Sequence, residues 1–146
     1  MLYPIYQIEL PPQPESVAFV NGFLTRDFTG FFWLWTNLFW INRVTTQAEG
    51  CVQVKAGICS PTEVMMVSYW RSEHSLKQFF RGKWHQQMMQ FVAKHPSSLC
   101  LYNEIYQPSQ VGKYIHEPQG MATIYPRLAK GNATRTTNYE VKVRDK

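Results

Sequence analysis

The segment Val64–Val92, VMMVSYWRSEHSLKQFFRGKWHQQMMQFV, contains the strongest secondary-structure pattern of the chain. Its first part, residues 64–70, is rich in β-forming side chains and contains neither Gly nor Pro, which predicts a well-buried strand. Ser72 can cap a helix with its hydroxyl oxygen, and Glu73 places a negative charge in the first helical turn, where the helix dipole stabilises it. The segment therefore predicts a strand that is followed directly by a helix.

The helical part of this segment is interrupted at Gly82. Apolar residues recur at helical spacing on both sides of the glycine, so we expect a helix that is broken there. On a wheel of 3.6 residues per turn, one side of the second helical run is apolar except for a single histidine. That side consists of Trp84, His85, Met88, Met89, Phe91 and Val92. The pattern predicts that His85 lies within the apolar face of its helix.

Outside this segment, the chain shows three further strands and one further helix between residues 17 and 106. Each strand is bounded by turn-forming residues, and residues 51–59 alternate with the period of 2 that a strand requires. Together with the central segment, the order is β-α-β-β-α-β, the split βαβ arrangement. We therefore predict an α+β, ferredoxin-like fold with a four-stranded antiparallel sheet. The predicted strands cover residues 17–23, 51–59, 63–71 and 99–106, and the predicted helices cover residues 28–41 and 73–94.

A chain of 146 residues is long enough for one domain with a hydrophobic core. Residues 1–16 contain four prolines, so we expect an extended N-terminal arm rather than a regular element. The predicted domain spans residues 17–126. Residues 127–146 contain Gly, several Thr and mixed charges, which predicts a mobile, basic C-terminal tail.

The net charge of +5 is concentrated at the C-terminal end of the chain. Residues 127–146 hold six basic and two acidic side chains, a net charge of +4, whereas residues 1–126 hold nine and eight, a net charge of +1. A nearly neutral domain with a solvated basic tail is the favoured interpretation. We therefore expect no nucleic-acid partner.

The three cysteines are odd in number and fit no metal-binding spacing. Residues 1–14 also lack the basic start and apolar core of a signal peptide. These features predict a cytoplasmic protein with reduced thiols.

The helix predicted at residues 28–41 is apolar on nearly all sides. A membrane span requires about 20 mostly apolar residues, and this run is shorter and is interrupted by Thr36-Asn37. Contact with a membrane surface is a second interpretation of the helix. The favoured interpretation is burial between the sheet and a partner.

A family resemblance is carried by the pattern Ser-x-Trp-x-Ser at residues 68–72, by Leu-x-x-Phe at residues 76–79, and by His85 on the following helical turns. In these features the chain resembles the dimeric α/β-barrel (ferredoxin-like) proteins of the antibiotic-biosynthesis-monooxygenase type. It is most similar to the small monooxygenase-like family of a fungal polyketide oxygenase. The resemblance spans roughly residues 17–126, because the later segment Tyr102–Tyr106 also fits.

The resemblance implies a homodimer in which two sheets pack together to form the barrel. The aromatic content of 15% is consistent with this, since it exceeds what one small domain hides. The resemblance further implies a cavity between sheet and helices that binds a small apolar molecule, aromatic or polyketide-like. Polar or aromatic side chains that point into that space are candidate site residues.

His85 and Asn103 are the candidate catalytic residues. A neutral imidazole can act as an acid or base near pH 7, although a hydrogen-bonded core histidine explains His85 equally well. Amides within apolar strands need partners. They either form structural hydrogen bonds or bind the oxygen of a phenol or enolate. The candidate substrate-binding residues are Trp70, Tyr102, Asn21, Arg71 and Glu104, with core packing as the alternative for Trp70 and an ion pair as the alternative for Arg71 and Glu104.

The fourth strand departs from the resembled family at one position. Family members often carry Trp-His-Glu there, and this chain carries Tyr102-Asn103-Glu104. If the family histidine takes part in the chemistry, either this chain has lost activity or His85 is sufficient.

No dinucleotide loop, phosphate loop, catalytic triad or zinc spacing occurs in the sequence. We therefore predict no bound metal and no cofactor, with haem on His85 as the alternative. Three functions stay open: a cofactor-independent monooxygenase-like enzyme, a haem protein of the same fold, and a non-catalytic binding or interaction module.

Overall fold

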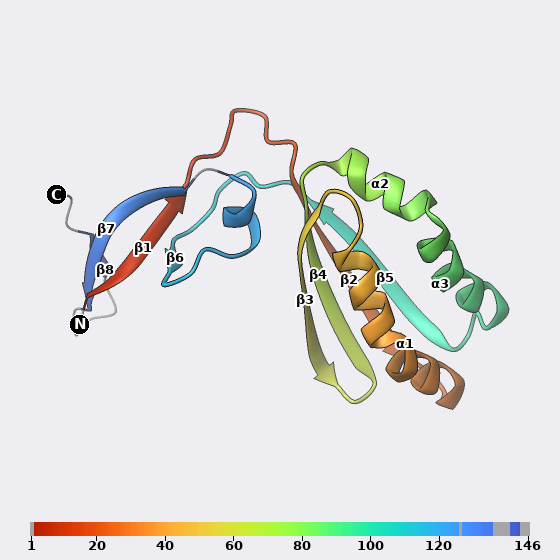
Figure 1. The fold of residues 1–146 in the computed structure, drawn as a ribbon. Helices are drawn as coiled ribbons and strands as arrows, with labels where there is room; N and C mark the ends of the chain where they lie inside the picture. Colours follow the sequence, from red (N-terminus) through yellow and green to blue (C-terminus); the bar gives the residue numbers. More distant parts are fainter. Residues whose placement is uncertain (1, 126, 136–140, 144–146) are drawn as a thin grey trace. The chain divides into compact units, whose positions relative to one another are not determined.

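The computed structural model describes residues 2–125, 127–135 and 141–143. The chain forms two compact units, which we describe separately (Figure 1). The larger unit comprises residues 15–107, and the smaller unit combines the chain before residue 15 with the chain after residue 107.

The larger unit has the predicted β-α-β-β-α-β order, and its second helical region is broken at Gly82. Its four strands form an antiparallel sheet in the order β3-β4-β2-β5, and all three helices lie on one face of that sheet (Figure 1). The α+β, ferredoxin-like fold is thus confirmed. Its elements are β2 (Val17–Thr25), α1 (Phe28–Thr46), β3 (Cys51–Ser60), β4 (Glu63–Trp70), α2 (Glu73–Arg81), α3 (Lys83–Lys94) and β5 (Leu99–Tyr106).

Hydrogen bonds of Asp27 connect the start of α1 to the turn before β5. Asp27 caps the helix by accepting a hydrogen bond from the Gly30 N–H at 2.8 Å, and its second carboxylate oxygen accepts one from the Ser98 hydroxyl at 2.8 Å. The Gly30 and Ser98 hydrogen bonds lower the pKa of Asp27. This position has no room for a side chain, because a Cβ on Gly30 would lie 2.1 Å from the Ser98 carbonyl oxygen.

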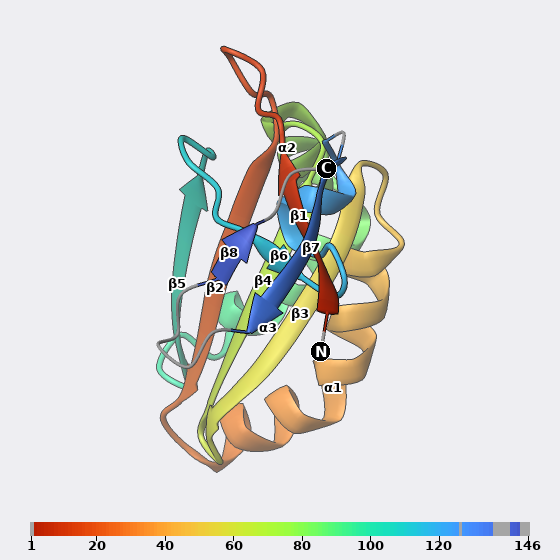
Figure 2. The same ribbon diagram turned by 90° about the vertical axis from the view of Figure 1, so that its left-hand side faces the viewer.

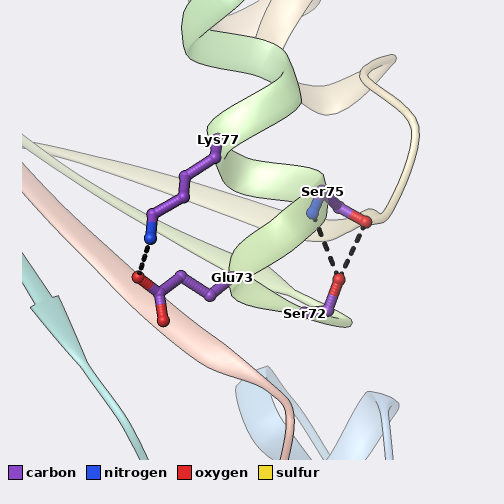
Figure 3. A network of polar contacts seen from close by, with 4 residues as sticks. All are labelled: Ser72, Glu73, Ser75 and Lys77. Atoms are coloured by element: carbon purple, nitrogen blue, oxygen red, sulfur yellow. Dashed lines mark hydrogen bonds and ion pairs between the residues drawn. The ribbon is translucent and has the colours of Figure 1, made fainter.

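The start of α2 is capped as the sequence predicts. The Ser72 hydroxyl oxygen accepts a hydrogen bond from the Ser75 N–H at 3.1 Å, and Glu73 pairs with Lys77 one turn later at 2.7 Å (Figure 3). Gly82 then adopts an extended conformation, with ψ 158°, and separates α2 from α3. Side-chain capping at Ser72 and the conformation of Gly82 together give the two-helix arrangement.

The hydrophobic core lies between the sheet and the helices. Trp70 is fully buried in it and donates a hydrogen bond from its indole nitrogen to the Ser68 hydroxyl at 2.8 Å. The buried side chains form two clusters, one of Phe23, Leu34, Ile41, Val64, Met66 and Met88, and one of Val17, Phe19, Trp70 and Leu76.

The smaller unit corrects the prediction for the two ends of the chain. A second sheet, in the order β6-β1-β7-β8, contains strands from both ends. Its elements are β1 (Leu2–Ile8), β6 (Tyr114–Ile115), the short 3-10 helix Gly120–Thr123, β7 (Arg127–Arg135) and β8 (Val141–Val143). Residues 108–125, which we predicted to belong to the central domain, are part of this unit.

The expectation that residues 1–16 contain no regular element is therefore wrong for Leu2–Ile8. Pro4 is tolerated in β1 because it lies beside an irregularity in the pairing with β7, where the missing N–H costs little. The partner strand β7 is more than 100 residues away in sequence, so no local sequence pattern predicts the pairing. Within the predicted mobile tail, β7 and β8 are strands, and residues 136–140 and 144–146 lie outside the described residues.

Helix α1 is less enclosed than its composition suggests. Leu34 and Ile41 are buried against the sheet, but Phe28, Phe32 and Phe39 are exposed. Among the described helices, none combines the length and the hydropathy that a bilayer crossing needs.

Candidate functional site

A cavity of about 50 Å³ lies between the sheet and the helices of the larger unit. Its walls are mostly apolar and include side chains from α1, α3 and the strands β2, β4 and β5. Four polar side chains reach it: Asn21, Asn103, His85 and Thr45. The first three are candidates that the sequence predicts, and they come from three different elements.

Asn21 and Asn103 are direct neighbours in the sheet. They face each other in the pairing of β2 with β5 and both line the cavity. Asn21 is half-buried, whereas Asn103 is exposed because β5 is an edge strand. No hydrogen bond joins either amide side chain to another residue in the described part of the chain. The two amides are therefore available to a ligand, and the structural hydrogen bonds considered as the alternative are not found.

His85 reaches the cavity from α3 and is oriented by the end of α2. Its Nδ1 lies 3.1 Å from the Phe80 carbonyl oxygen. Since a carbonyl oxygen can only accept a hydrogen bond, Nδ1 carries the hydrogen and Nε2 keeps its lone pair in the neutral ring. The ring packs against Phe79 and Phe80, with centroids 5.8 and 5.0 Å away.

This environment keeps His85 neutral. Burial lowers the pKa of His85, and the hydrogen bond to Phe80 opposes that effect only in part. A neutral imidazole with a free Nε2 lone pair is the form that can accept a proton from a substrate near pH 7.

The pKa of His85 leads to a testable dependence of stability on pH. The unfolded chain, with a histidine pKa near 6.5, binds this proton more readily than the folded chain does. The free energy of unfolding should therefore decrease as the pH falls through about 6.5, and should be regained above it. Urea unfolding followed by tryptophan fluorescence measures the free energy of unfolding at each pH between about 5 and 8.

The control is His85→Asn, which removes the titrating ring while the other histidines remain. We expect its stability to depend less on pH than that of the unsubstituted chain. Identical pH profiles for the two proteins would contradict a pKa lowered by burial.

The remaining candidates do not line the cavity. Trp70 belongs to the buried core, which favours its packing role, and Arg71 is exposed just after β4. Tyr102 and Glu104 lie on the opposite face of the sheet, because successive side chains of a strand point to opposite faces. The Tyr102 ring covers Gly22, and Glu104 accepts a hydrogen bond from the Tyr106 hydroxyl. The ion pair that we considered as the alternative for Arg71 and Glu104 is not formed among the described residues.

Thr45 is the polar cavity residue that we did not predict. It is buried near the end of α1, and its hydroxyl donates to the Ile41 carbonyl at 2.7 Å. Its position on the sheet-facing side of an apolar helix could have identified it. Because its hydrogen is already donated, Thr45 can only accept from a ligand.

In the present arrangement of side chains, the cavity at His85 is too small for a haem group. A volume of about 50 Å³ is far below the roughly 300–1,000 Å³ of pockets for drug-sized ligands. The His85 ring itself packs against Phe79 and Phe80. Within the described ranges, no group of three or more His, Cys, Asp or Glu side chains could hold a metal ion.

Comparison with known proteins gives one family match. The model of the family described as "Monooxygenase af470-like" matches residues 36–121. None of the curated proteins is significantly similar in sequence.

Three solved structures illustrate the shared fold. A variant of SnoaB, a cofactor-independent oxygenase from Streptomyces nogalater, has a TM-score of 0.52 at 9% identity, over 66% of this chain and 96% of SnoaB. A proposed antibiotic biosynthesis monooxygenase from Deinococcus radiodurans has a TM-score of 0.55 at 17% identity, over 64% and 94% of the two chains. A protein from Shewanella oneidensis has a TM-score of 0.55 at 16% identity, over 77% and 99%. At these identities the similarity establishes the fold.

Proposed function

Because the chain belongs to the monooxygenase af470-like family, we propose that it is a monooxygenase for an apolar aromatic or polyketide-like substrate and that it works without a cofactor. The observation that carries this proposal is the polar lining of the cavity. A pair of unpaired amides and a neutral histidine line the same, otherwise apolar space. The cofactor independence of SnoaB, which has a similar fold, supports the second half of the proposal.

The substrate class follows from the charges that this cavity can stabilise. Its polar groups are neutral, and its walls are apolar. A phenol or enolisable ketone is neutral when it binds and becomes an anion when His85 Nε2 accepts its proton. The amide N–H groups of Asn21 and Asn103 can then donate to the anionic oxygen, where the apolar surroundings strengthen the interaction.

The electron-rich anion is the species that reacts with O₂. For a ring CH₂ group that enolises, the balanced reaction converts CH₂ and O₂ to C=O and H₂O. The carbon loses four electrons, which both atoms of O₂ accept, so no external reductant is required. The chain contributes proton transfer, stabilisation of the anion and exclusion of water.

Admission of such a substrate requires side chains to move. A cavity of about 50 Å³ has room for O₂ but not for a polycyclic molecule. Met88 and Met89 on α3 line the cavity and are flexible enough to change conformation. We expect the substrate to displace them.

The test is an oxygen-consumption assay with the full chain, pretreated with a chelator and supplied with no flavin or nicotinamide. The substrates are polycyclic aromatic ketones that enolise to phenols. We expect one O₂ to be consumed per substrate and, with ¹⁸O₂, one labelled atom in the product. Turnover that appears only after a flavin or a metal is added would contradict cofactor independence. Absence of turnover with the whole substrate class would contradict the function.

We also propose that two copies pack their sheets together on the face without helices. That face presents apolar side chains from three strands, among them Val20 of β2, Val67 of β4 and Tyr106 of β5. Val67 lies on a central strand of the sheet, so an arginine there would place a charge in the middle of the contact.

Light scattering coupled to size-exclusion chromatography checks the assembly at micromolar concentration. The unsubstituted chain should have twice the mass of one chain, and Val67→Arg should have the mass of one. Gln78→Arg, on the exposed side of α2, is the control and should remain dimeric. A single-chain mass for the unsubstituted protein, or a dimeric Val67→Arg, would contradict this packing.

A further inference from the structure

The outward side of α1 carries an aromatic ridge, which we define as Phe28, Phe32 and Phe39. These side chains are 81%, 63% and 84% exposed. On a helical wheel they lie within about 40° of one another, opposite Leu34 and Ile41, which are buried against the sheet. A surface helix normally presents polar side chains on this side, so three adjacent phenylalanines indicate an interaction surface.

The ridge continues into a groove at the start of α1. The groove has a volume of about 340 Å³ and is lined by Phe28 and Phe31, together with Thr25, Arg26, Asp27 and Thr62. Phe28 belongs to both the ridge and the groove. The apolar surface is therefore continuous from the ridge into the groove, where the charged side chains of Arg26 and Asp27 also lie.

The named side chains of this surface carry two positive charges, on Arg26 and Arg43, and one negative charge, on Asp27. Arg43 lies on the same side of α1 as the ridge and is exposed, and Arg26 is exposed beside the groove. Neither forms an ion pair with a described residue. Helix α1 itself contains no Asp or Glu, and the Asp27 carboxylate already accepts hydrogen bonds from Gly30 and Ser98. An apolar partner with negative charge at its boundary complements this surface.

The shape and size of the aromatic ridge distinguish between two binding partners, a second copy of the chain and a lipid bilayer. The exposed rings offer on the order of 400–500 Å² of apolar surface, about half of the roughly 800 Å² that each partner contributes to a standard protein interface. A second copy of the chain would also need a complementary groove for a convex ridge. A bilayer needs no such complementarity, because its acyl chains and headgroups adapt to the inserted rings.

We propose that the aromatic ridge of α1 docks on an anionic membrane surface. The three phenylalanine rings insert at the boundary between headgroups and acyl chains, and Arg26 and Arg43 pair with lipid phosphates or carboxylates at the level of the headgroups. Aromatic insertion and electrostatic attraction then act together, as peripheral binding to a membrane requires.

Sedimentation of the full chain with vesicles tests the proposal. The vesicles contain phosphatidylcholine alone or with about 30% phosphatidylserine, a content that gives the negative surface potential on which basic residues act. We expect binding to the anionic vesicles. The partition coefficient should fall at least tenfold in the Phe28→Ser/Phe32→Ser/Phe39→Ser variant, and severalfold in Arg26→Gln/Arg43→Gln.

The matched control is Ile105→Ser, which removes an exposed apolar side chain from β5 outside both the ridge and the proposed dimer face, and should bind like the unsubstituted chain. Failure of the unsubstituted chain to bind anionic vesicles would overturn the proposal. Equal binding by the triple serine variant would also overturn it, and would assign the attraction to the basic residues 127–146. A dimer that the triple substitution converts to a monomer, with no vesicle binding, would show that the ridge is a self-association surface instead.

Discussion

Replacing Asn103 with alanine is expected to lower the turnover number about 100- to 1,000-fold, the usual cost of removing one hydrogen-bond donor to an oxyanion. The reason is that Asn103 faces Asn21 across the β2–β5 pair and lines the same cavity as His85. The donor acts mainly on the anion that forms during the reaction, so kcat should fall more than the affinity for the neutral substrate. Steady-state kinetics of O₂ consumption measure both quantities.

Two variants separate this role from a general effect on the sheet. Tyr102→Phe changes the neighbouring residue on the opposite face, keeps the ring over Gly22, and should leave kcat unchanged. Asn103→Asp preserves the size of the side chain but places a carboxylate where the substrate anion forms, so it should be at least as impaired as the alanine variant. Similar turnover for Asn103→Ala and Tyr102→Phe would show that Asn103 does not stabilise the anion.

Replacing Gly30 with alanine is expected to destabilise the larger unit by about 3 kcal/mol. Helix propensity alone would predict a gain of about 1 kcal/mol from this change. The contact with Ser98 turns this expected gain in stability into a loss, because the new Cβ would lie 2.1 Å from a backbone carbonyl oxygen. A backbone atom cannot move aside by changing a side-chain rotamer. The start of α1 would have to move away and would weaken the Asp27 cap and the hydrogen bond between Asp27 and Ser98.

Urea unfolding followed by tryptophan fluorescence measures this loss, because all five tryptophans lie within residues 15–107. Gly57→Ala is the matched control, since a Cβ at Gly57 would meet nothing within 4 Å. Its stability should change by no more than about 0.5 kcal/mol. If both alanine variants are equally stable, the close packing of α1 on Ser98 does not contribute as we describe.

Local interactions explain why so much of the larger unit could be predicted. The Ser72 cap depends on residues three positions apart, and the extended conformation of Gly82 depends on the missing side chain of one residue. Strand and helix periods depend on neighbours two to four positions away, so they are visible in the sequence. The inward position of His85 follows from the helical period in the same way.

Three of the predicted site residues, Trp70, Tyr102 and Glu104, lie away from the cavity for reasons that differ. Alternation along β5 already separates Tyr102 and Glu104 from Asn103, so their assignment to one site contradicted a rule that the sequence itself supplies. The burial of Trp70 in the core could not be predicted in this way, because it depends on how α2 packs onto β4.

The sequence by itself determined the order of elements in the larger unit, the break between α2 and α3, and three of the polar residues that line the cavity. Only the tertiary structure decided that Asn21 faces Asn103, that the two ends of the chain form a second sheet, and that three phenylalanines of α1 face solvent. Each of these depends on contacts between residues far apart in the chain. Strand register and the covering of a helix face are set by the packing of the whole unit, and a local pattern does not contain that information.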